Sequence, residues 1–334
     1  MPVFESEMRP SFGESLIEAD TPSELAFKDP MIIRILRTLA ERKYLGAMDA
    51  ERIQLCLDEA IKNAMLHGNK YHPDRLVGYH LYADGDRWGL VISDEGEGMS
   101  PKKIPQQLEV EDDLRESGYG IMLMDQMLDE VVYMGAGNHL LMVKKRSEQA
   151  LADPATLVAV DVMSEEEMDD VGAGYIEPEA GAMASMDFDM DADWDTPAPA
   201  IEKEVEPEFE VGIKDATLLS ETGTLRVHEK NGMRIAELLT RQISDHNLDL
   251  VRPAIIEAAE GQEVIILDLG HVSYASSVVL GAFVNIYKEL KARGAQLRIS
   301  SMTPTIAEVF KITHLDKLLP NFPNADAAIV GEEE

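Results

Sequence analysis

The chain of 334 residues is poor in cysteine, aromatic side chains and positive charge, and it contains no long apolar run. Its one cysteine, Cys56, excludes an intrachain disulfide and any metal site built from several cysteines. No apolar stretch approaches the roughly 20 residues that a membrane-spanning helix needs. The chain has 30 basic and 63 acidic residues. The resulting net charge of −33 argues against nonspecific binding to nucleic acid or anionic membranes.

The first residues, Met1–Met8, have neither the basic region nor the apolar region of a secretory signal. We therefore expect a cytoplasmic protein with no direct nucleic-acid or membrane partner. Cys56 lies within an apolar pattern, which predicts a small buried side chain rather than a reactive thiol.

The acidic residues that are present gather in one stretch of the chain. Residues 151–210 contain 19 acidic residues and a single basic residue, Lys203, together with proline, glycine and alanine. Like charges at this density repel one another and bury little apolar surface, so we expect a disordered acidic linker. The sequence thus predicts a first domain over residues 10–148, a linker over 149–221 and a second domain over 222–330.

The first domain alternates apolar helical patterns with strand patterns. Asp49 is a plausible N-cap of the helix that runs through His67, and Asp84-Gly85-Asp86 is a hairpin turn. Predicted helices cover 30–42, 49–67 and 121–128, and predicted strands cover 77–83, 88–93, 131–134 and 139–144. Helices mixed with antiparallel strands favour an α/β sandwich of two layers.

The second domain is predicted to be a small α/β unit with a central sheet. Asn231-Gly232 is a strong hairpin signal between two short strands. The predicted strands cover 225–228, 233–239, 264–267 and 296–300, and the predicted helices cover 248–259, 277–293 and 305–312.

Two polar residues on the apolar helix 49–67 are the first candidates for chemistry. Glu59 and Asn63 are four residues apart, so their side chains share one face. A carboxylate beside a carboxamide suits a proton-accepting base and a divalent metal ligand. The alternative interpretation is a solvated polar stripe on a surface helix.

Two glycine-containing motifs follow in the same domain. Asp94-Glu-Gly96-Glu-Gly98 ends a strand, where an aspartate can accept a hydrogen bond from an adenine amino group. Gly118-Tyr-Gly120 opens a helix, where backbone N–H groups can converge on phosphate oxygens. Each motif alone is also compatible with an ordinary turn.

The ordered set of three elements resembles the N, G1 and G2 boxes of the GHKL ATPase superfamily, whose domains have the Bergerat fold. His67-Gly68-Asn69 and the short interval from Asp94 to Gly118 look like the bacterial anti-sigma-factor serine kinases. One departure concerns the position two residues before Gly118, which is often basic in the family. Here it is Glu116, with Arg115 one position earlier, so Arg115 does not match the basic position of the family.

The resemblance implies a role for each candidate residue. Asn63 would coordinate a Mg²⁺ ion that bridges the phosphates of ATP, and Glu59 would act as base or orienting group for a substrate hydroxyl. The remaining residues would bind the nucleotide. Asp94 would bind the adenine, and Gly96 and Gly98 would shape the adenine pocket. Gly118 and Gly120 would hold the phosphates.

The second domain resembles STAS domains, the fold of the anti-anti-sigma antagonists, over the motif at residues 264–283. The alignment places the phosphorylated serine of that family on Ser277, with Ser276 as second choice. The flanking aspartate, serine or threonine, and glycine of the family motif are replaced here by Ser276, Val278 and Val279. Both serines could instead serve only as helix N-caps, and the domain could bind a partner constitutively.

Together the resemblances imply an ATP-dependent serine kinase fused to its own type of substrate domain, acting in a partner-switching pathway. The substrate would be a STAS domain in cis or in trans, and a sigma factor is a further expected partner. Kinases of this family tend to be dimers, which leaves a homodimer as one expectation. The alternative is a noncatalytic interaction protein in which ATP sets the conformation and both domains bind partners.

Overall fold

A computed structural model describes residues 2–47, 49–99, 119–147, 151–154, 213–243 and 245–331. The predicted acidic linker falls mostly outside these residues. Its predicted end at residue 221 is wrong, because residues 217–221 form a strand of the second domain. The predicted start of the first domain at residue 10 is wrong as well, because residues 3–5 already belong to its sheet.

The first domain has one six-stranded sheet in the order β1-β5-β6-β4-β3-β2. β1 pairs parallel with β5, and all other neighbours are antiparallel. The strands are β1 (Val3–Glu5), β2 (Glu14–Pro22), β3 (Leu76–Ala83), β4 (Arg87–Asp94), β5 (Glu130–Met134) and β6 (His139–Lys145). The helices are α1 (Lys28–Glu41), α2 (Ala50–Lys62) and α3 (Tyr119–Met127), with the 3₁₀ turn Leu25–Phe27 before α1.

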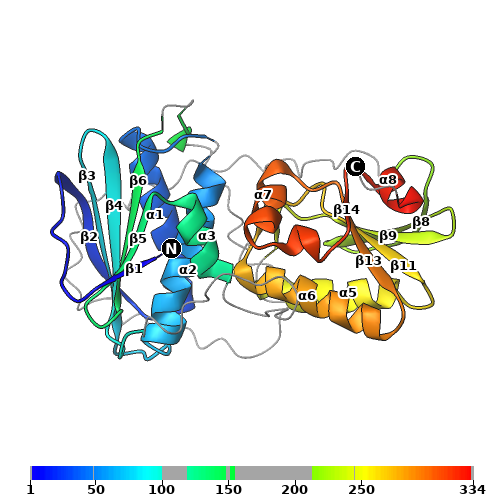
Figure 1. Ribbon diagram of the computed structural model, residues 1–334, viewed down its shortest axis with the longest axis horizontal. Coiled ribbons are helices and arrows are strands. Elements are labelled where there is room, and N and C mark those ends of the chain that lie inside the picture. The colour runs from blue at the N-terminus through cyan, green and yellow to red at the C-terminus, as the bar shows by residue number, and fades with distance from the viewer. Residues whose placement is uncertain are drawn as a thin grey trace. The chain divides into compact units, whose positions relative to one another are not determined.

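Figure 1 shows α1, α2 and α3 over the same face of this sheet, which confirms the two-layer α/β sandwich. Alternate strand residues, such as Leu90 and Ile92 on β4, pack against the apolar stripe of α2 around Leu57 and Ile61. The opposite face carries a smaller apolar cluster that includes Tyr82, whose ring is met edge-on by Phe12. The core between sheet and helices therefore fixes α2, the helix that carries Glu59.

The helix predicted through His67 changes form after Lys62. It continues as a π-helical turn over Asn63–Gly68, in which the N–H of Asn69 donates to the carbonyl of Ala64. Asp49 occupies the N-cap position of α2, but its side chain makes no capping hydrogen bond, so the predicted cap is only positional. Turns of the π type often occur at functional sites because they locally redirect side chains.

The second domain has a six-stranded sheet in the order β14-β13-β11-β9-β8-β7. β7, β8 and β9 are antiparallel, whereas β9, β11, β13 and β14 are parallel. Its main strands are β7 (Thr217–Glu221), β8 (Leu225–Lys230), β9 (Met233–Leu238), β11 (Val264–Asp268), β13 (Gln296–Ser300) and β14 (Asn321–Phe322). β10 (Gln242–Ile243) and β12 (Tyr274–Ala275) form a separate two-stranded pair.

Helices cover both faces of the second sheet. α5 (Asp245–Ala258) and α6 (Ser277–Ala292) pack on the face that presents Ile265 and Leu267, and α8 (Ala325–Val330) packs on the face that presents Ile266. α7 (Pro304–Ile312) and the 3₁₀ turn Leu315–Lys317 follow β13. Asn231 and Gly232 both have positive φ, 53° and 78°, which confirms the predicted hairpin.

In the part of the chain that the structure describes, no helix combines the length and apolar character required to cross a bilayer. Cys56 is 1% exposed, as predicted, and burial raises its pKa to about 12.

Candidate functional site

Glu59 lies on the last full turn of α2 and is 5% exposed. Its carboxylate reaches the start of α3, where a Cβ atom built on Gly120 would lie 2.2 Å from Glu59 Oε2. A side chain at position 120 would therefore push the carboxylate aside. The structure thus brings together a carboxylate and a glycine that belong to two separate sequence motifs.

The electrostatic surroundings of Glu59 favour a carboxylate that accepts protons readily. Burial raises its pKa, the adjacent Asp58 raises it further, and Lys62 and hydrogen bonds from Ser277 oppose the rise. A carboxylate with a raised pKa is a stronger base than an exposed one. Glu59 therefore has the character that general-base work requires.

Asp58 precedes Glu59 and forms ion pairs with two lysines. The sequence interpretation did not single it out. Its carboxylate binds Lys28 at the start of α1 and lies 3.0 Å from the Nζ atom of Lys62. Burial alone raises the pKa of Asp58, but the two lysines outweigh burial and hold the pKa below its usual value. This buried ion triad ties α1 to the part of α2 that carries Glu59.

Asn63 is half-buried at the junction between α2 and the π-helical turn. It follows Glu59 by one helical turn, so both side chains lie on the same side of the helix. A carboxamide oxygen is a suitable ligand for Mg²⁺ together with phosphate oxygens and water. The residue thus fits a Mg²⁺–ATP complex, and this role stays a prediction.

Asp94 ends β4 in a narrow space between two glycines. A Cβ atom on Gly68 would lie 2.2 Å from Asp94 Cγ, and one on Gly96 would lie 2.3 Å from the carbonyl oxygen of Gly68. The N–H of Gly96 donates to Asp94 Oδ1 at 2.9 Å. Burial raises the pKa of Asp94, while the bond from Gly96 opposes the rise. A half-buried carboxylate can accept a hydrogen bond from an amino group, and the predicted binding of adenine by Asp94 stays a prediction.

Asn69 supports this cradle and was missed as a functional residue, although it was noted as part of the motif that follows Asn63. It is fully buried, its Oδ1 accepts from the N–H of Glu95, and its Nδ2 donates to the carbonyl of Leu76, both at 2.8 Å. The end of the π-helical turn is thereby fixed to the residue after Asp94. The position of Asn69, a polar residue directly after Gly68, was the sequence signal that could have identified it.

The remaining glycine predictions have mixed outcomes. Gly98 has φ +81°, and a Cβ atom there would lie 2.1 Å from the carbonyl oxygen of Ala136, so this turn requires glycine. Gly118, Arg115 and Glu116 lie outside the described residues. The structure therefore places only Gly120 of the predicted phosphate-binding pair.

Ser277 is the first residue of α6, and its backbone N–H donates to Glu59 Oε1 at 3.0 Å. A hydrogen bond from the Ser277 side chain also lowers the pKa of Glu59, in opposition to the effect of burial. Ser276 is buried at the N-cap position, but its side chain makes no capping hydrogen bond, so the alternative interpretation as a side-chain N-cap is wrong for Ser276. The predicted acceptor and the predicted base are thus in contact.

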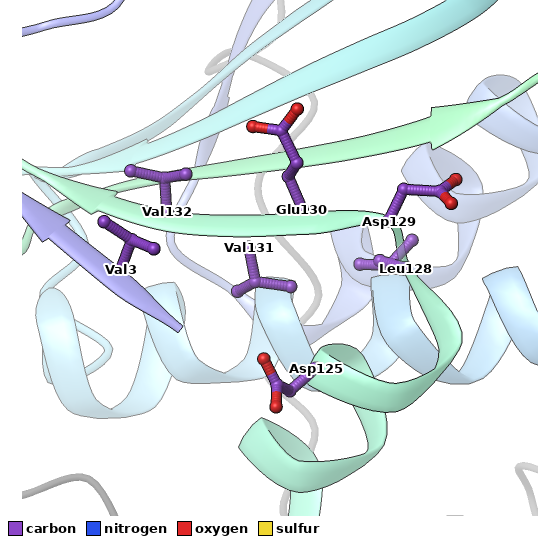
Figure 2. A pocket seen from close by; sticks show the side chains of 7 residues that line it. All are labelled: Val3, Asp125, Leu128, Asp129, Glu130, Val131 and Val132. Atoms are coloured by element: carbon purple, nitrogen blue, oxygen red, sulfur yellow. The ribbon is translucent and has the colours of Figure 1, made fainter. Parts of the chain in front are cut away.

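A small acidic hollow lies elsewhere, at the turn between α3 and β5. Figure 2 shows Asp125, Asp129 and Glu130 around it, together with Val3 and its apolar neighbours. Glu130 is already paired with Arg9 at 2.6 Å. The hollow contains none of the predicted site residues, and the site at Glu59 is a separate feature.

Comparison with protein families finds two domains. Residues 22–144 match the histidine kinase-like ATPase domain, and residues 227–328 match the STAS domain. Among curated proteins, the chain is 35% identical over 81 residues to the anti-sigma F factor of Halalkalibacterium halodurans, covering 24% of this chain and 56% of that protein. It is 32% identical over 104 residues to the serine-protein kinase RsbW of Staphylococcus epidermidis, covering 29% of this chain and 65% of that protein. The chain thus spans between half and two thirds of these relatives.

Solved structures similar to the chain include an anti-sigma-factor antagonist (STAS) domain protein from Planctomyces limnophilus. The identity is 17% and the TM-score 0.30, covering 33% of this chain and 98% of that one. An anti-sigma factor antagonist from Mycobacterium paratuberculosis gives 23% identity and a TM-score of 0.30, covering 34% and 97%. From the two family matches, the chain carries a histidine kinase-like ATPase domain followed by a STAS domain.

Proposed function

We propose that the protein is an ATP-dependent serine kinase of the partner-switching type, whose substrate is the hydroxyl of Ser277 in a STAS domain. The observation that carries the proposal is the contact between Glu59 and Ser277, because it joins a buried carboxylate of raised pKa to a serine at a helix start. The names of the relatives, an anti-sigma F factor and a serine-protein kinase, support the same activity and a sigma factor as a further partner.

The proposed reaction is a single phosphoryl transfer. The Ser277 hydroxyl oxygen attacks the γ-phosphorus of ATP, the bond to the β-phosphate oxygen breaks, and ADP leaves. Glu59 accepts the hydroxyl proton as the new bond forms. The phosphoserine would then lie at the N-terminus of α6, where the helix dipole favours negative charge.

The ATPase domain supplies the groups that would hold the nucleotide. Asp94 would bind the adenine amino group, Gly120 would leave room for phosphates beside Glu59, and Asn63 would hold a Mg²⁺ ion that neutralises phosphate charge. Phosphoryl transfer depends mainly on positioning and charge neutralisation, so this sparse set suffices.

Incubation with Mg²⁺–ATP followed by intact-mass measurement and peptide mapping tests the proposal. We expect one phosphate on Ser277, no phosphate in Ser277→Ala, and at least about a hundredfold slower transfer in Glu59→Gln, the usual size for loss of a general base. If neither this chain nor an added STAS protein gains a phosphate, the kinase proposal fails. The noncatalytic, ATP-responsive interaction protein would then be the better description.

A further inference from the structure

A second set of contacts joins α2 to the STAS domain, at the opposite end of α2 from Glu59. Arg52 Nη2 lies 2.6 Å from Glu308 Oε2, and the Thr305 hydroxyl donates to Glu51 Oε2 at 2.7 Å. Glu51 and Arg52 lie in the first turn of α2, and Thr305 and Glu308 lie in the N-terminal half of α7. Two complementary polar contacts thus connect two helix starts.

The geometry of α7 orients both of its contacting side chains toward the start of α2. Thr305 and Glu308 are three residues apart, so their side chains share one face of the helix. The start of α7 is itself fixed, because Thr303 accepts from the N–H of Ile306 and Pro304 occupies the first turn. Arg52 is also oriented by Asp49, whose Oδ1 lies 3.7 Å from Arg52 Nη1.

The STAS domain contacts α2 near both of its ends. Glu51 precedes Glu59 by eight residues, which places the two contacts about 12 Å apart along the helix axis. α3 also packs against α6 and α7. The polar contact at the start of α2 adds a restraint on the orientation of the STAS domain and on the direction from which the Ser277 hydroxyl reaches Glu59.

We propose that Glu51 and Arg52 form a recognition surface for α7 of the chain's own STAS domain, and that this surface presents Ser277 to Glu59 in cis. The inference rests on the proposed kinase function and adds to it the recognition element and the intramolecular substrate. Arg52 and Glu308 are about one third exposed, so their ion pair contributes orientation and specificity more than affinity.

Cross-linking tests the docking without any need for catalysis. In the full chain carrying Glu51→Cys and Thr305→Cys, a short bis-maleimide is expected to link the two cysteines within one molecule, at a rate independent of protein concentration. Native Cys56 is buried and does not compete. The control pair is Arg42→Cys with Thr305→Cys, since Arg42 contacts Glu14 within the ATPase domain. If both pairs link at the same rate, the recognition surface is wrong, whatever the kinase activity.

Charge reversal tests the role of the surface in phosphorylation. We expect Arg52→Glu and Glu308→Arg each to slow phosphorylation of Ser277 by about five- to tenfold, because the ion pair becomes a like-charge contact. The double variant restores the pair and should recover to within about threefold of the native rate. Arg42→Glu, an equal charge change, should have no effect. Slow single variants without recovery in the double variant would overturn the proposal, whereas absence of phosphate in the native chain would overturn the kinase function itself.

Discussion

At the scale of single residues, Glu59 combines burial with a raised pKa. A carboxylate in a largely apolar helix interface loses hydration, and its neighbour Asp58 repels it. Lys62 and Ser277 compensate for part of this cost. Such a group reduces the stability of the fold, as is common for residues that are kept for function.

Replacing Glu59 by glutamine should therefore stabilise the protein at neutral pH. The folded-state pKa of Glu59 lies above its unfolded value, so the folded chain binds the proton more tightly, and stability falls as pH rises between the two values. Glutamine carries no charge and keeps an oxygen for the Ser277 N–H. We expect Tm to rise by about 2–4 °C at pH 7.5, and the gain to shrink toward pH 4.5. Thermal denaturation at both pH values measures this, and a larger gain at the lower pH would contradict the burial argument.

Gly120→Ala should separate activity from stability. The added Cβ meets the end of a flexible side chain, Glu59 Oε2, so the carboxylate can rotate away and the fold survives. We expect phosphorylation of Ser277 to slow at least about tenfold, because the base loses its position, while Tm changes by no more than a few degrees.

Gly85→Ala is the matched control for this substitution. Gly85 lies in the turn between β3 and β4, and a Cβ atom there has no neighbour within 4 Å. Both variants add one methyl group, and only the first should affect phosphate transfer. Equal rates in the two variants would show that the approach of Gly120 to Glu59 has no catalytic importance.

At the scale of elements, local patterns predicted most of the fold. The amphipathic helices and the hairpins at Asp84–Asp86 and Asn231–Gly232 were predicted because their signals lie within a few neighbouring residues. β2 was missed because it is an edge strand in which only Ile17 and Thr21 are buried, so no apolar alternation marks it. β1 has three residues and pairs with β5, more than 120 residues away, which no local pattern reveals.

The site shows the same division between local and distant information. Glu59, Asp94 and the glycines were found because motif spacing is visible along the chain. The ion triad around Asp58 was missed because Lys28 comes from another helix and its role depends on three-dimensional packing. The π-helical turn was likewise not predictable, since its residues have the same apolar pattern as an ordinary helix.

Asn69→Ala should damage both the turn and the nucleotide site. The substitution leaves the N–H of Glu95 and the carbonyl of Leu76 without their part-buried partner, and each lost hydrogen bond contributes about 0.5–1.5 kcal/mol. We expect the free energy of unfolding to fall by about 1–3 kcal/mol in urea denaturation, and ATP affinity to weaken because Asp94 loses its support. Asp74→Ala, at an exposed position in the same loop, serves as control. Unchanged ATP affinity would limit Asn69 to a purely structural role.

At the scale of the whole molecule, the ATPase domain and the STAS domain share one chain, and under the proposed function this determines how the rate of phosphorylation depends on protein concentration. An acceptor tethered to its kinase experiences an effective concentration in the millimolar range when the connection can span the two sites. The contacts of Ser277 with Glu59 and of α7 with the start of α2 lie within one chain, and the proposed function makes Ser277 an intramolecular substrate.

The rate constant for phosphorylation of Ser277 should therefore not change over a hundredfold dilution of the protein. A mixing experiment sharpens this expectation: a Glu59→Gln chain keeps its acceptor and a Ser277→Ala chain keeps its base, so only transfer between molecules can phosphorylate the mixture. At low micromolar concentration we expect this transfer to be at least about tenfold slower than in the native chain, because the second molecule lacks the advantage of the tether. Intact-mass measurement distinguishes the two chains. A rate proportional to concentration, together with efficient transfer in the mixture, would assign the acceptor to a neighbouring molecule and make the fused STAS domain a substrate in trans.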